Sequence, residues 1–258
     1  MKKHLIPIFL LLATTDVFGQ LNESDTVKIQ LRASLSGNYQ QGNVALLAVR
    51  SKLDFTVSPV SAIVFKSQNS SLYQEFGNRK ADNDLFSRNY FYWKPQKKVY
   101  PFAIAYISSN FRRKMNTRVF AGAGVTYQLV QEQYHVLKLS ASAVYETNRF
   151  KGTLYNKTEY NGSNQINLWR GTLYAGGWHY LLHHKLRLYY DAYWQPGFNK
   201  SSNYRTQYDV GVDLPVWKGL NFSALYTFTH ENVVVQNIKQ NDKVLTFGFS
   251  YNFKQKHK

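Results

Sequence analysis

The 258-residue sequence lacks cysteine entirely, and its 15 acidic residues are fewer than half of its 32 basic residues. Without cysteine, the chain has no disulfide framework, no thiolate metal ligand and no thiol nucleophile. It also lacks any apolar run long enough for a helix to cross a bilayer. Aromatic residues make up 16% of the chain, which argues against a disordered protein.

The N-terminus has the features of a secretory signal peptide. A basic start at residues 1–4 precedes the apolar run 5–13, and Val17 and Gly19 occupy the −3 and −1 positions of a cleavage site. The apolar run is too short to span a membrane. We therefore expect residues 1–19 to be removed on export and Gln20 to begin the mature chain.

A period of two dominates the mature sequence. In residues 27–39 the odd-numbered positions are apolar or small and the even-numbered positions are polar. A helix would scatter these residues around its axis, whereas a strand sorts them onto two faces. The same pattern predicts about twelve strands, near residues 27–39, 47–57, 61–73, 85–94, 100–106, 119–129, 137–146, 165–180, 186–194, 204–214, 220–228 and 243–253.

The connections between these strands alternate in length. Short ones are expected at 58–60, 95–98, 131–135, 181–185 and 215–219, and longer polar ones at 74–84, 109–116, 148–164 and 232–241, while 40–43 and 199–203 are short connections on the longer side. Outer-membrane barrels have short periplasmic turns and longer external loops. The fold class predicted is therefore all-β, an antiparallel transmembrane β-barrel of about 12 strands with that asymmetry.

The predicted organisation has a single folded domain. A short periplasmic segment, 20–26, precedes the barrel, 27–253, and a basic tail, 254–258, follows it. The alternative is a water-soluble β-sandwich or lipocalin-like barrel with its apolar faces turned inward. Twelve such faces would need a very large core, and the polar faces would carry fewer acids than a soluble surface usually does.

The last strand resembles the sorting signal of bacterial outer-membrane proteins, in which a polar residue and a glycine precede aromatics and a final Phe. The residues that carry this resemblance are Thr246, Gly248, Tyr251 and Phe253. The resemblance implies the barrel-assembly machinery as a partner during insertion. The basic tail departs from it, since many such proteins stop at the Phe. An ordinary apolar strand is the alternative, because alternating aromatics are common in strands.

Three further segments resemble the putative salt-induced outer-membrane protein family, a domain of unknown function. They are Leu35-Ser36-Gly37-Asn38 with Gly42-Asn43, the run Phe120-Ala121-Gly122-Ala123-Gly124-Val125-Thr126-Tyr127-Gln128-Leu129, and the ending Leu245-Thr246-Phe247-Gly248-Phe249-Ser250-Tyr251. The likeness covers roughly residues 27–253. It implies an outer-membrane β-barrel in the bacterial cell envelope and brings no established chemistry.

The sequence contains no convincing catalytic constellation. No nucleophile accompanies a histidine, and His230-Glu231 lacks the second histidine of a zinc-binding helix. Gly122-Ala123-Gly124 lies inside a predicted strand with no helix after it, so it is not a phosphate-binding loop. We therefore expect no enzyme activity, no cofactor and no metal site.

The polar faces of the strands carry charges that would point into the lumen. With Lys28 they give eight bases against six acids, and the candidates for lumen lining or selectivity are Arg32, Arg50, Lys52, Asp54, Arg118, Lys138, Glu146, Arg187, Asp191, Arg205, Asp209, Asp213 and Glu231. One interpretation is a ladder of neutralising pairs that fills and stiffens the lumen. The other is a narrow channel whose excess positive charge selects small anions.

The predicted external loops are also basic. Arg112, Arg113 and Lys114 at the rim are candidates for contact with lipopolysaccharide phosphates. A solvated charge run is the alternative. Nucleic acid is an unsuitable partner, because this surface would face the outside of the cell.

Two functions remain open from the sequence. The first is a non-enzymatic barrel of the bacterial outer membrane that acts as a narrow pore or receptor for small anionic or polar solutes. The alternative is a structural or stress-response barrel of the salt-induced type with a closed lumen. Both imply a monomer surrounded by outer-membrane lipid and lipopolysaccharide, and the solute is not specified.

Overall fold

The computed structural model describes residues 21–25, 27–41 and 45–256. The predicted signal peptide and the end of the basic tail lie outside the described residues, as does the Gly42-Asn43 part of the family resemblance.

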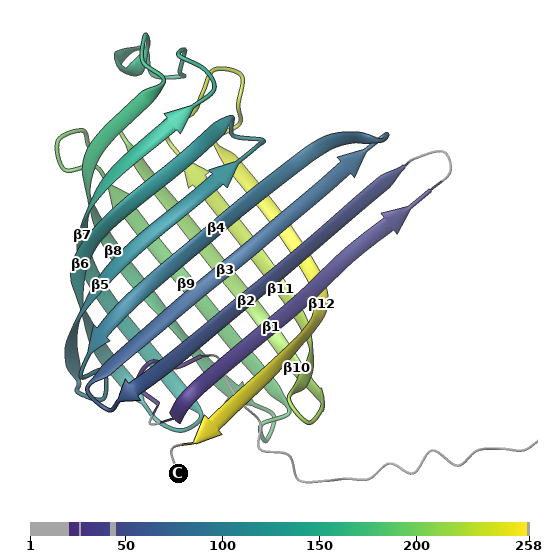
Figure 1. Cartoon of the computed structure of the whole chain (residues 1–258), viewed down its shortest axis with the longest axis vertical. Coiled ribbons are helices and arrows are strands. Elements are labelled where there is room, and N and C mark those ends of the chain that lie inside the picture. Colours follow the sequence, from purple (N-terminus) through teal and green to yellow (C-terminus); the bar gives the residue numbers. More distant parts are fainter. Residues whose placement is uncertain (1–20, 26, 42–44, 257–258) are drawn as a thin grey trace, which may run out of the picture.

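Within these residues, twelve antiparallel strands close into one barrel, so the predicted fold class is confirmed (Figure 1). Each strand pairs with its neighbours in sequence, and the last pairs with the first. The strands are β1 (Val27–Gln40), β2 (Leu46–Val60), β3 (Ile63–Phe76), β4 (Arg79–Trp93), β5 (Val99–Asn110), β6 (Met115–Gln131), β7 (His135–Phe150), β8 (Gln165–Leu181), β9 (Leu186–Pro196), β10 (Tyr204–Trp217), β11 (Leu220–Glu231) and β12 (Asn241–Lys256). A 3-10 turn, η1 (Thr158–Tyr160), lies in the connection between β7 and β8.

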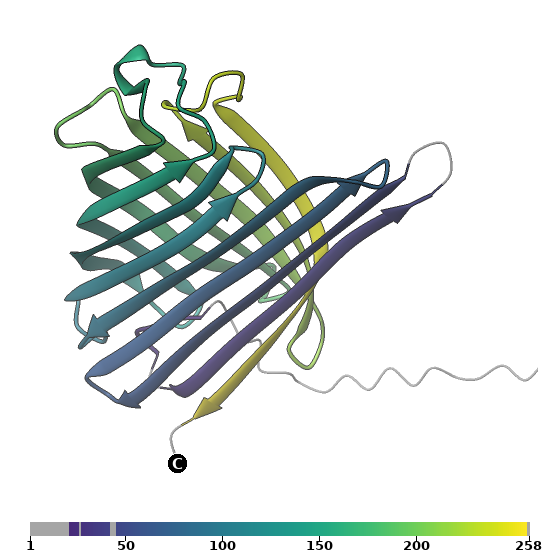
Figure 2. The same cartoon turned by 45° about the horizontal axis from the view of Figure 1, so that its top comes forward.

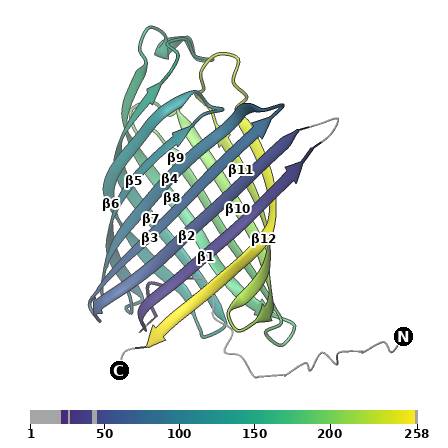
Figure 3. The same ribbon diagram turned by 45° about the vertical axis from the view of Figure 1, so that its right-hand side comes forward.

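The two ends of the barrel differ. At the end where β1 begins and β12 finishes, called the terminal end below, tight turns join the strands (Figure 3). At the opposite end, called the loop end, the connections 151–164 and 232–240 are long. This is the asymmetry that the sequence predicts.

Several predicted loops are shorter than expected because the strands continue past the apolar stretch. Residues 74–84, expected to form a loop, belong mostly to β3 and β4, and the turn is only Gly77 and Asn78. Both turn residues have positive φ, 56° and 58°, which suits a two-residue hairpin turn. Polar residues on both faces conceal the alternation near the loop end, where no apolar outer face is needed.

The outer face of the barrel is apolar and the inner face is largely polar. Leu35, Phe247 and Phe249 point outward with exposed fractions of 63%, 55% and 55%. Such a surface buries its apolar side chains only in lipid. The soluble alternative, with apolar faces inside, is therefore wrong.

In the part of the chain that the structure describes, no helix is long and apolar enough to cross a bilayer.

Three apolar clusters lie inside the barrel and at its loop end. At the loop end, Met115 and Phe150 pack with residues of the connections 151–164 and 232–240, including Tyr155 and Val235. Figure 2 shows these two connections gathered on one side of the loop end, away from the tips of β1 and β2. The other clusters lie between inner faces of neighbouring strands, Val64, Tyr92, Tyr100 and Phe102 in one, and Val136, Trp178, Tyr180 and Tyr189 in the other.

The seam between the first and last strands is short. Pairing between β1 and β12 runs from Val27 and Lys256 to Leu35 and Phe249. Among the described residues, no pairing between these two strands continues beyond that point, although β1 extends to Gln40 and pairs there with β2. The seam therefore occupies the terminal half of the barrel.

Glycines in β6 allow this strand to approach β7 closely. A Cβ atom at Gly122 would lie 2.0 Å from the carbonyl oxygen of Ala143 and 2.7 Å from Cα of Val144. Both are backbone atoms of the adjacent strand, so a side chain at Gly122 cannot be accommodated by rotation of a neighbour.

We predict that Gly122→Val reduces the free energy of unfolding by about 1–3 kcal/mol, the usual cost of overpacking. The fraction of protein that migrates as a folded barrel when unboiled samples are run on a gel should fall with it. The matched control is Ala123→Val, because Ala123 is an exposed residue of the same strand. Equal folded fractions for the two variants would contradict the prediction.

Candidate functional site: the charged barrel interior

The interior of the barrel is organised around four buried carboxylates, each of which lies between two basic side chains. The carboxylates belong to Glu23, Glu146, Asp213 and Glu231. Their paired bases are Lys66 and Lys138, Arg170 and Arg205, Arg32 and Arg187, and Arg113 and Arg118. In three of the groups one negative charge faces two positive charges, and in the Glu231 group Asp242 supplies a second negative charge.

Asp213 on β10 connects strands that lie on the two sides of the seam between β1 and β12. Arg32 of β1 lies 3.1 Å from Asp213 Oδ1, and Arg187 of β9 contacts Oδ2. Ser223 donates a hydrogen bond of 2.6 Å to the same carboxylate. Hydrogen bonds and paired cations offset the cost of burying this charge.

Glu146 on β7 is fully buried between two arginines. Arg170 Nε donates to Oε1 at 2.8 Å, and Arg205 Nη2 lies 2.6 Å from Oε2. Asn148 adds a hydrogen bond of 2.7 Å. These residues come from β7, β8 and β10, so the carboxylate ties non-adjacent strands together.

Glu231, at the end of β11, binds Arg118 of β6 through two hydrogen bonds of 2.8 Å. Arg113 lies 3.7 Å from Glu231 and 2.5 Å from Asp242. This group crosses the lumen near the loop end. It joins β6 to β11 and β12, strands on opposite sides of the wall.

The fourth carboxylate does not come from a strand. Residues Leu21–Asp25 fold into the terminal end of the barrel, where Leu21 is 3% and Glu23 5% exposed. Glu23 lies 3.2 Å from Lys66 Nζ and 2.7 Å from Lys138 Nζ, and Tyr100 donates a hydrogen bond of 2.8 Å to it. The sequence prediction treats residues 20–26 as a short periplasmic segment and does not anticipate this position.

The charge of Glu23 is set by two opposing effects. Burial alone would raise the pKa of its carboxyl group, but the ammonium groups of Lys138 and Lys66 hold the pKa well below its usual range. Glu23 is therefore ionised at neutral pH, and its pairing stabilises the folded barrel.

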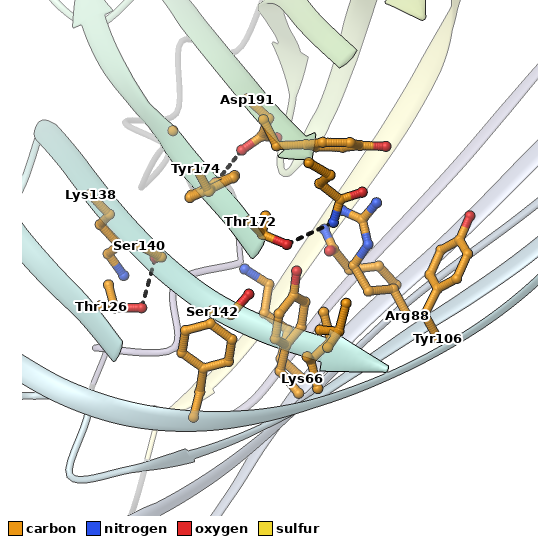
Figure 4. A pocket seen from close by; sticks show the side chains of 18 of the residues that line it. Lys66, Arg88, Tyr106, Thr126, Lys138, Ser140, Ser142, Thr172, Tyr174 and Asp191 are labelled. Atoms are coloured by element: carbon orange, nitrogen blue, oxygen red, sulfur yellow. Dashed lines mark hydrogen bonds between the residues drawn. The ribbon is translucent and has the colours of Figure 1, made fainter. Parts of the chain in front are cut away.

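Two adjoining cavities occupy the lumen. The larger, of about 300 Å³, reaches toward the loop end and is lined by Arg50, Lys52 and Asp54 among others. The smaller, of about 100 Å³, lies deeper and is bounded by Glu23 and Lys138 (Figure 4). Both cavities are lined by Gln68, Arg88, Tyr106, Arg118, Tyr174, Asp191 and Tyr193. A solute in the larger cavity is therefore in contact with residues of the deeper one.

Three cations in these cavities stand outside the ion-pair groups. Among the described residues, no carboxylate pairs with Arg50, Lys52 or Arg88, and none of the three makes a hydrogen bond. The Arg88 guanidinium lies 5.6 Å from the ring centre of Tyr106 and 5.8 Å from that of Tyr193. These rings leave its hydrogen-bond donors available to a ligand.

The acids near these cations are partly engaged by neutral donors. Tyr174 donates a hydrogen bond to Asp191, and Gln207 donates one of 2.8 Å to Asp209. Asp54 accepts a hydrogen bond from the backbone of Asn69.

The structure places the lumen residues predicted from the sequence inside the barrel. Eight of them, Arg32, Arg50, Lys52, Asp54, Arg118, Asp191, Asp209 and Glu231, line the larger cavity, and Lys138 and Arg205 line the deeper one. Glu146, Arg187 and Asp213 lie in the ion-pair groups of the wall. Lys28 is exposed at the terminal end instead, beside a register shift between Val27 and Ile29.

Sequence reasoning missed Lys66 and Arg88, because β3 and β4 alternate poorly. The outward residue Asn69 of β3 pairs with Ser87 of β4, so these two strands carry polar residues on the outer face as well. It also missed Glu23, Arg170 and Asp242. A basic residue flanked by aromatics, as Arg88 is by Phe86 and Tyr90, is the signal that could have indicated an inner face.

The predicted rim residues divide between two environments. Arg113 is 5% exposed and pairs inward with Asp242, and Arg112 pairs with Asp82 at 2.5 Å. Lys114 is exposed. Of these three rim residues, Lys114 is the one whose charge faces solvent. It has no ion pair with any of the described residues.

The four residues of the predicted assembly signal lie on both faces of β12. Tyr251 and Phe253 are outward, with exposed fractions of 48% and 43%, whereas Thr246 and Gly248 line the larger cavity. A Cβ atom at Gly248 would lie 2.7 Å from the carbonyl oxygen of Leu35 on β1. Gly248 therefore allows the close approach of the two seam strands.

The histidines form no metal centre in the described residues, where no group of three or more potential ligands occurs. His135 and His179, paired across β7 and β8, contact each other through Nδ1 atoms 3.2 Å apart. Tyr190 contacts His179 Nε2 at 2.9 Å.

A closed twelve-stranded antiparallel barrel with an apolar outside and a charged lumen is the fold of an outer-membrane β-barrel. Its backbone resembles the NanC porin, with a TM-score of 0.52 and 10% sequence identity over 86% of this chain and 98% of that chain. This likeness shows the fold alone. The chain belongs to the family of proteins of unknown function DUF481, whose profile matches residues 22–253.

Two further structures align with lower TM-scores, which support no inference. The translocator domain of the autotransporter NalP from Neisseria meningitidis has a TM-score of 0.45 and 12% identity, covering 87% of each chain. The outer membrane channel DcaP of Acinetobacter baumannii has a TM-score of 0.39 and 10% identity, covering 88% of this chain and 95% of that chain. A comparison with curated proteins finds no match.

We predict that Glu146→Gln lowers the free energy of unfolding by about 3–5 kcal/mol, because it leaves Arg170 and Arg205 buried without a counter-charge. The measurement is a urea titration of the protein folded in lipid vesicles. Glu132→Gln is the control, since Glu132 is exposed in the turn between β6 and β7. If the two variants unfold at the same urea concentration, the Glu146 group does not hold the wall together.

We further predict how stability depends on pH at Glu23. Because pairing depresses its folded-state pKa, its contribution is fully present above its ordinary value of about 4.5 and is lost as the pH falls below it. The difference in unfolding free energy between the wild type and Glu23→Gln should be constant from neutral pH to about 5 and then shrink. A difference that does not vary with pH in acid would show that the Glu23 charge is not the stabilising element.

Proposed function

We propose that the protein is a non-enzymatic barrel of the bacterial outer membrane that admits small anionic or polar solutes into its lumen. The observation that carries this proposal is the set of cations Arg50, Lys52 and Arg88. They line the larger cavity and have neither an ion pair nor a hydrogen bond among the described residues. Donors held without partners in a polar cavity favour an anionic ligand.

The surrounding charge groups support the same preference. Each of the four buried carboxylates is paired with two bases. The groups of Glu23, Glu146 and Asp213 therefore retain positive charge, whereas Asp242 balances the group of Glu231. Fixed charge has a long reach in a confined lumen, because low-dielectric walls reduce screening. The resulting field attracts anions from the loop end.

A barrel with a closed lumen is the second candidate, and two observations favour it. The segment Leu21–Asp25 fills part of the terminal end, and the groups of Glu146 and Glu231 link distant strands. A barrel stiffened in this way suits a structural or stress-response role of the salt-induced type. Conduction decides between the two candidates.

The environment of the barrel is part of the proposal. Export by a signal peptide, insertion by the barrel-assembly machinery and a monomeric state within outer-membrane lipid and lipopolysaccharide agree with the apolar outer face. The outward aromatics Tyr251 and Phe253 suit an assembly signal, with Thr246 and Gly248 on the other face. Arg112 and Lys114 remain the proposed lipopolysaccharide contacts, and Lys114 has the more accessible charge. Arg113 is withdrawn from this set, because its side chain is buried and pairs inward with Asp242.

The test is single-channel conductance in a planar bilayer, with the reversal potential measured under a potassium chloride gradient. The wild type should favour chloride over potassium. Replacing Arg50, Lys52 and Arg88 by Gln should shift the reversal potential toward cation selectivity, because the field that attracts anions is removed.

Lys243→Gln is the matched control, since Lys243 is an exposed outward residue of β12. It removes one positive charge of the same kind from the outer surface and should leave the reversal potential unchanged. A cation-selective wild type would refute the anion preference. A wild type without conductance would favour the closed barrel.

A further inference from the structure

Side chains from three strands converge on the carboxylate of Glu23. Lys66 of β3 and Lys138 of β7 lie 3.2 and 2.7 Å from its oxygens, and Tyr100 of β5 donates a hydrogen bond of 2.8 Å. The side chains of both lysines are about one-tenth exposed or less. The wall thus presents three donors to one small anionic group.

This group differs from the other three in where its acid comes from. Glu146, Asp213 and Glu231 lie on β7, β10 and β11, so in those groups the strands supply acid and base together. Here the strands supply only the bases, and a segment outside the barrel wall supplies Glu23. Without Glu23, neither buried ammonium group would have an ion-pair partner, and the wall would offer only the more distant carboxylate of Asp191 to Lys66, which is unfavourable.

The segment that carries Glu23 is held mainly by polar contacts. Lys66 donates to the carbonyl oxygen of Leu21, and Lys138 donates to the side chains of Asn22 and Ser24. Asn22 also exchanges two hydrogen bonds with Gln30 of β1. Leu21 provides the main apolar anchor. Water and a small anion can replace most of these contacts when the segment leaves.

The deeper cavity connects this place to the rest of the lumen. It is bounded by Glu23, Lys66 and Lys138, and it adjoins the larger cavity through shared residues such as Arg88. Figure 4 shows Lys66 and Lys138 at this cavity together with the hydroxyl groups of Thr126 and Ser140. A solute in this cavity therefore lies beside these donors and beside Glu23.

We propose that Lys66, Lys138 and Tyr100 form a binding site for the carboxylate group of small organic acids. Glu23 occupies the site as a tethered carboxylate and closes the terminal end of the lumen. A free carboxylate takes its place when the N-terminal segment moves out. This inference specifies the chemical class of the solute in the proposed function. It rests on that function because solutes must reach the cavity through the lumen.

The test uses acetate as the probe and thermal unfolding of the folded barrel as the readout. Glu23→Ala empties the site, so sodium acetate should raise its Tm in a saturable way relative to sodium chloride of equal ionic strength. At ten times its dissociation constant, acetate should raise the Tm by about 3–5 °C. The wild type, whose site is filled by Glu23, should show no such rise.

Two variants serve as controls. Glu132→Ala removes an exposed acid of the terminal end and should behave as the wild type does. The double variant Glu23→Ala with Lys138→Met should lose the acetate effect, because a principal donor is gone. If Glu23→Ala responds to acetate no more than the wild type, the proposal is overturned.

Poor folding of Glu23→Ala would not prevent the test. The same site would then act during refolding, and acetate should increase the yield of folded barrel on a gel where chloride does not. No rescue by acetate would overturn the proposal. Conductance is measured separately. If Glu23→Ala binds acetate but the barrel never conducts, the binding site is supported and the proposed channel function is refuted.

Discussion

The structure depends on buried carboxylates that each bind two cations in the lumen. A charge inside a narrow barrel loses water, and only an opposite charge with further hydrogen bonds compensates for that loss. Glu146, Asp213 and Glu231 meet this requirement with arginines from other strands. One arrangement therefore has two effects: it joins distant parts of the wall, and it leaves the groups of Glu146 and Asp213 with one positive charge in excess.

Much of the fold could be predicted from the sequence, because a membrane barrel has a simple physical requirement. Lipid demands an apolar outer face along each strand, and that demand produces the alternation seen from Val27 to Tyr39. The prediction of strand ends fails beyond the lipid-facing region, where the outer face need not be apolar. Near the loop end β3 and β4 are polar on both faces, so their extension and the tight turn at Gly77 and Asn78 were not visible.

The sequence indicates which charged residues face the interior, but not which of them form ion pairs with one another. Alternation placed Arg32, Asp213 and Arg187 on inner faces, but it cannot show that three strands bring them to one point. It gave no indication of Glu23, because that residue precedes the first strand and has no periodic context. Whether a cation such as Arg50 is paired or available depends on the shape of the closed barrel, which only the fold determines.

The short seam has a consequence for the order of folding. Most strand pairs are hairpins between neighbours in the chain, but the pairing of Leu35 with Phe249 joins residues more than two hundred positions apart along the sequence. Such a contact forms late, since its loop-closure entropy falls when the intervening hairpins are already in place. With eight paired positions, the β1–β12 contact should limit the rate at which the sheet becomes a cylinder, and thermal opening should begin at that line.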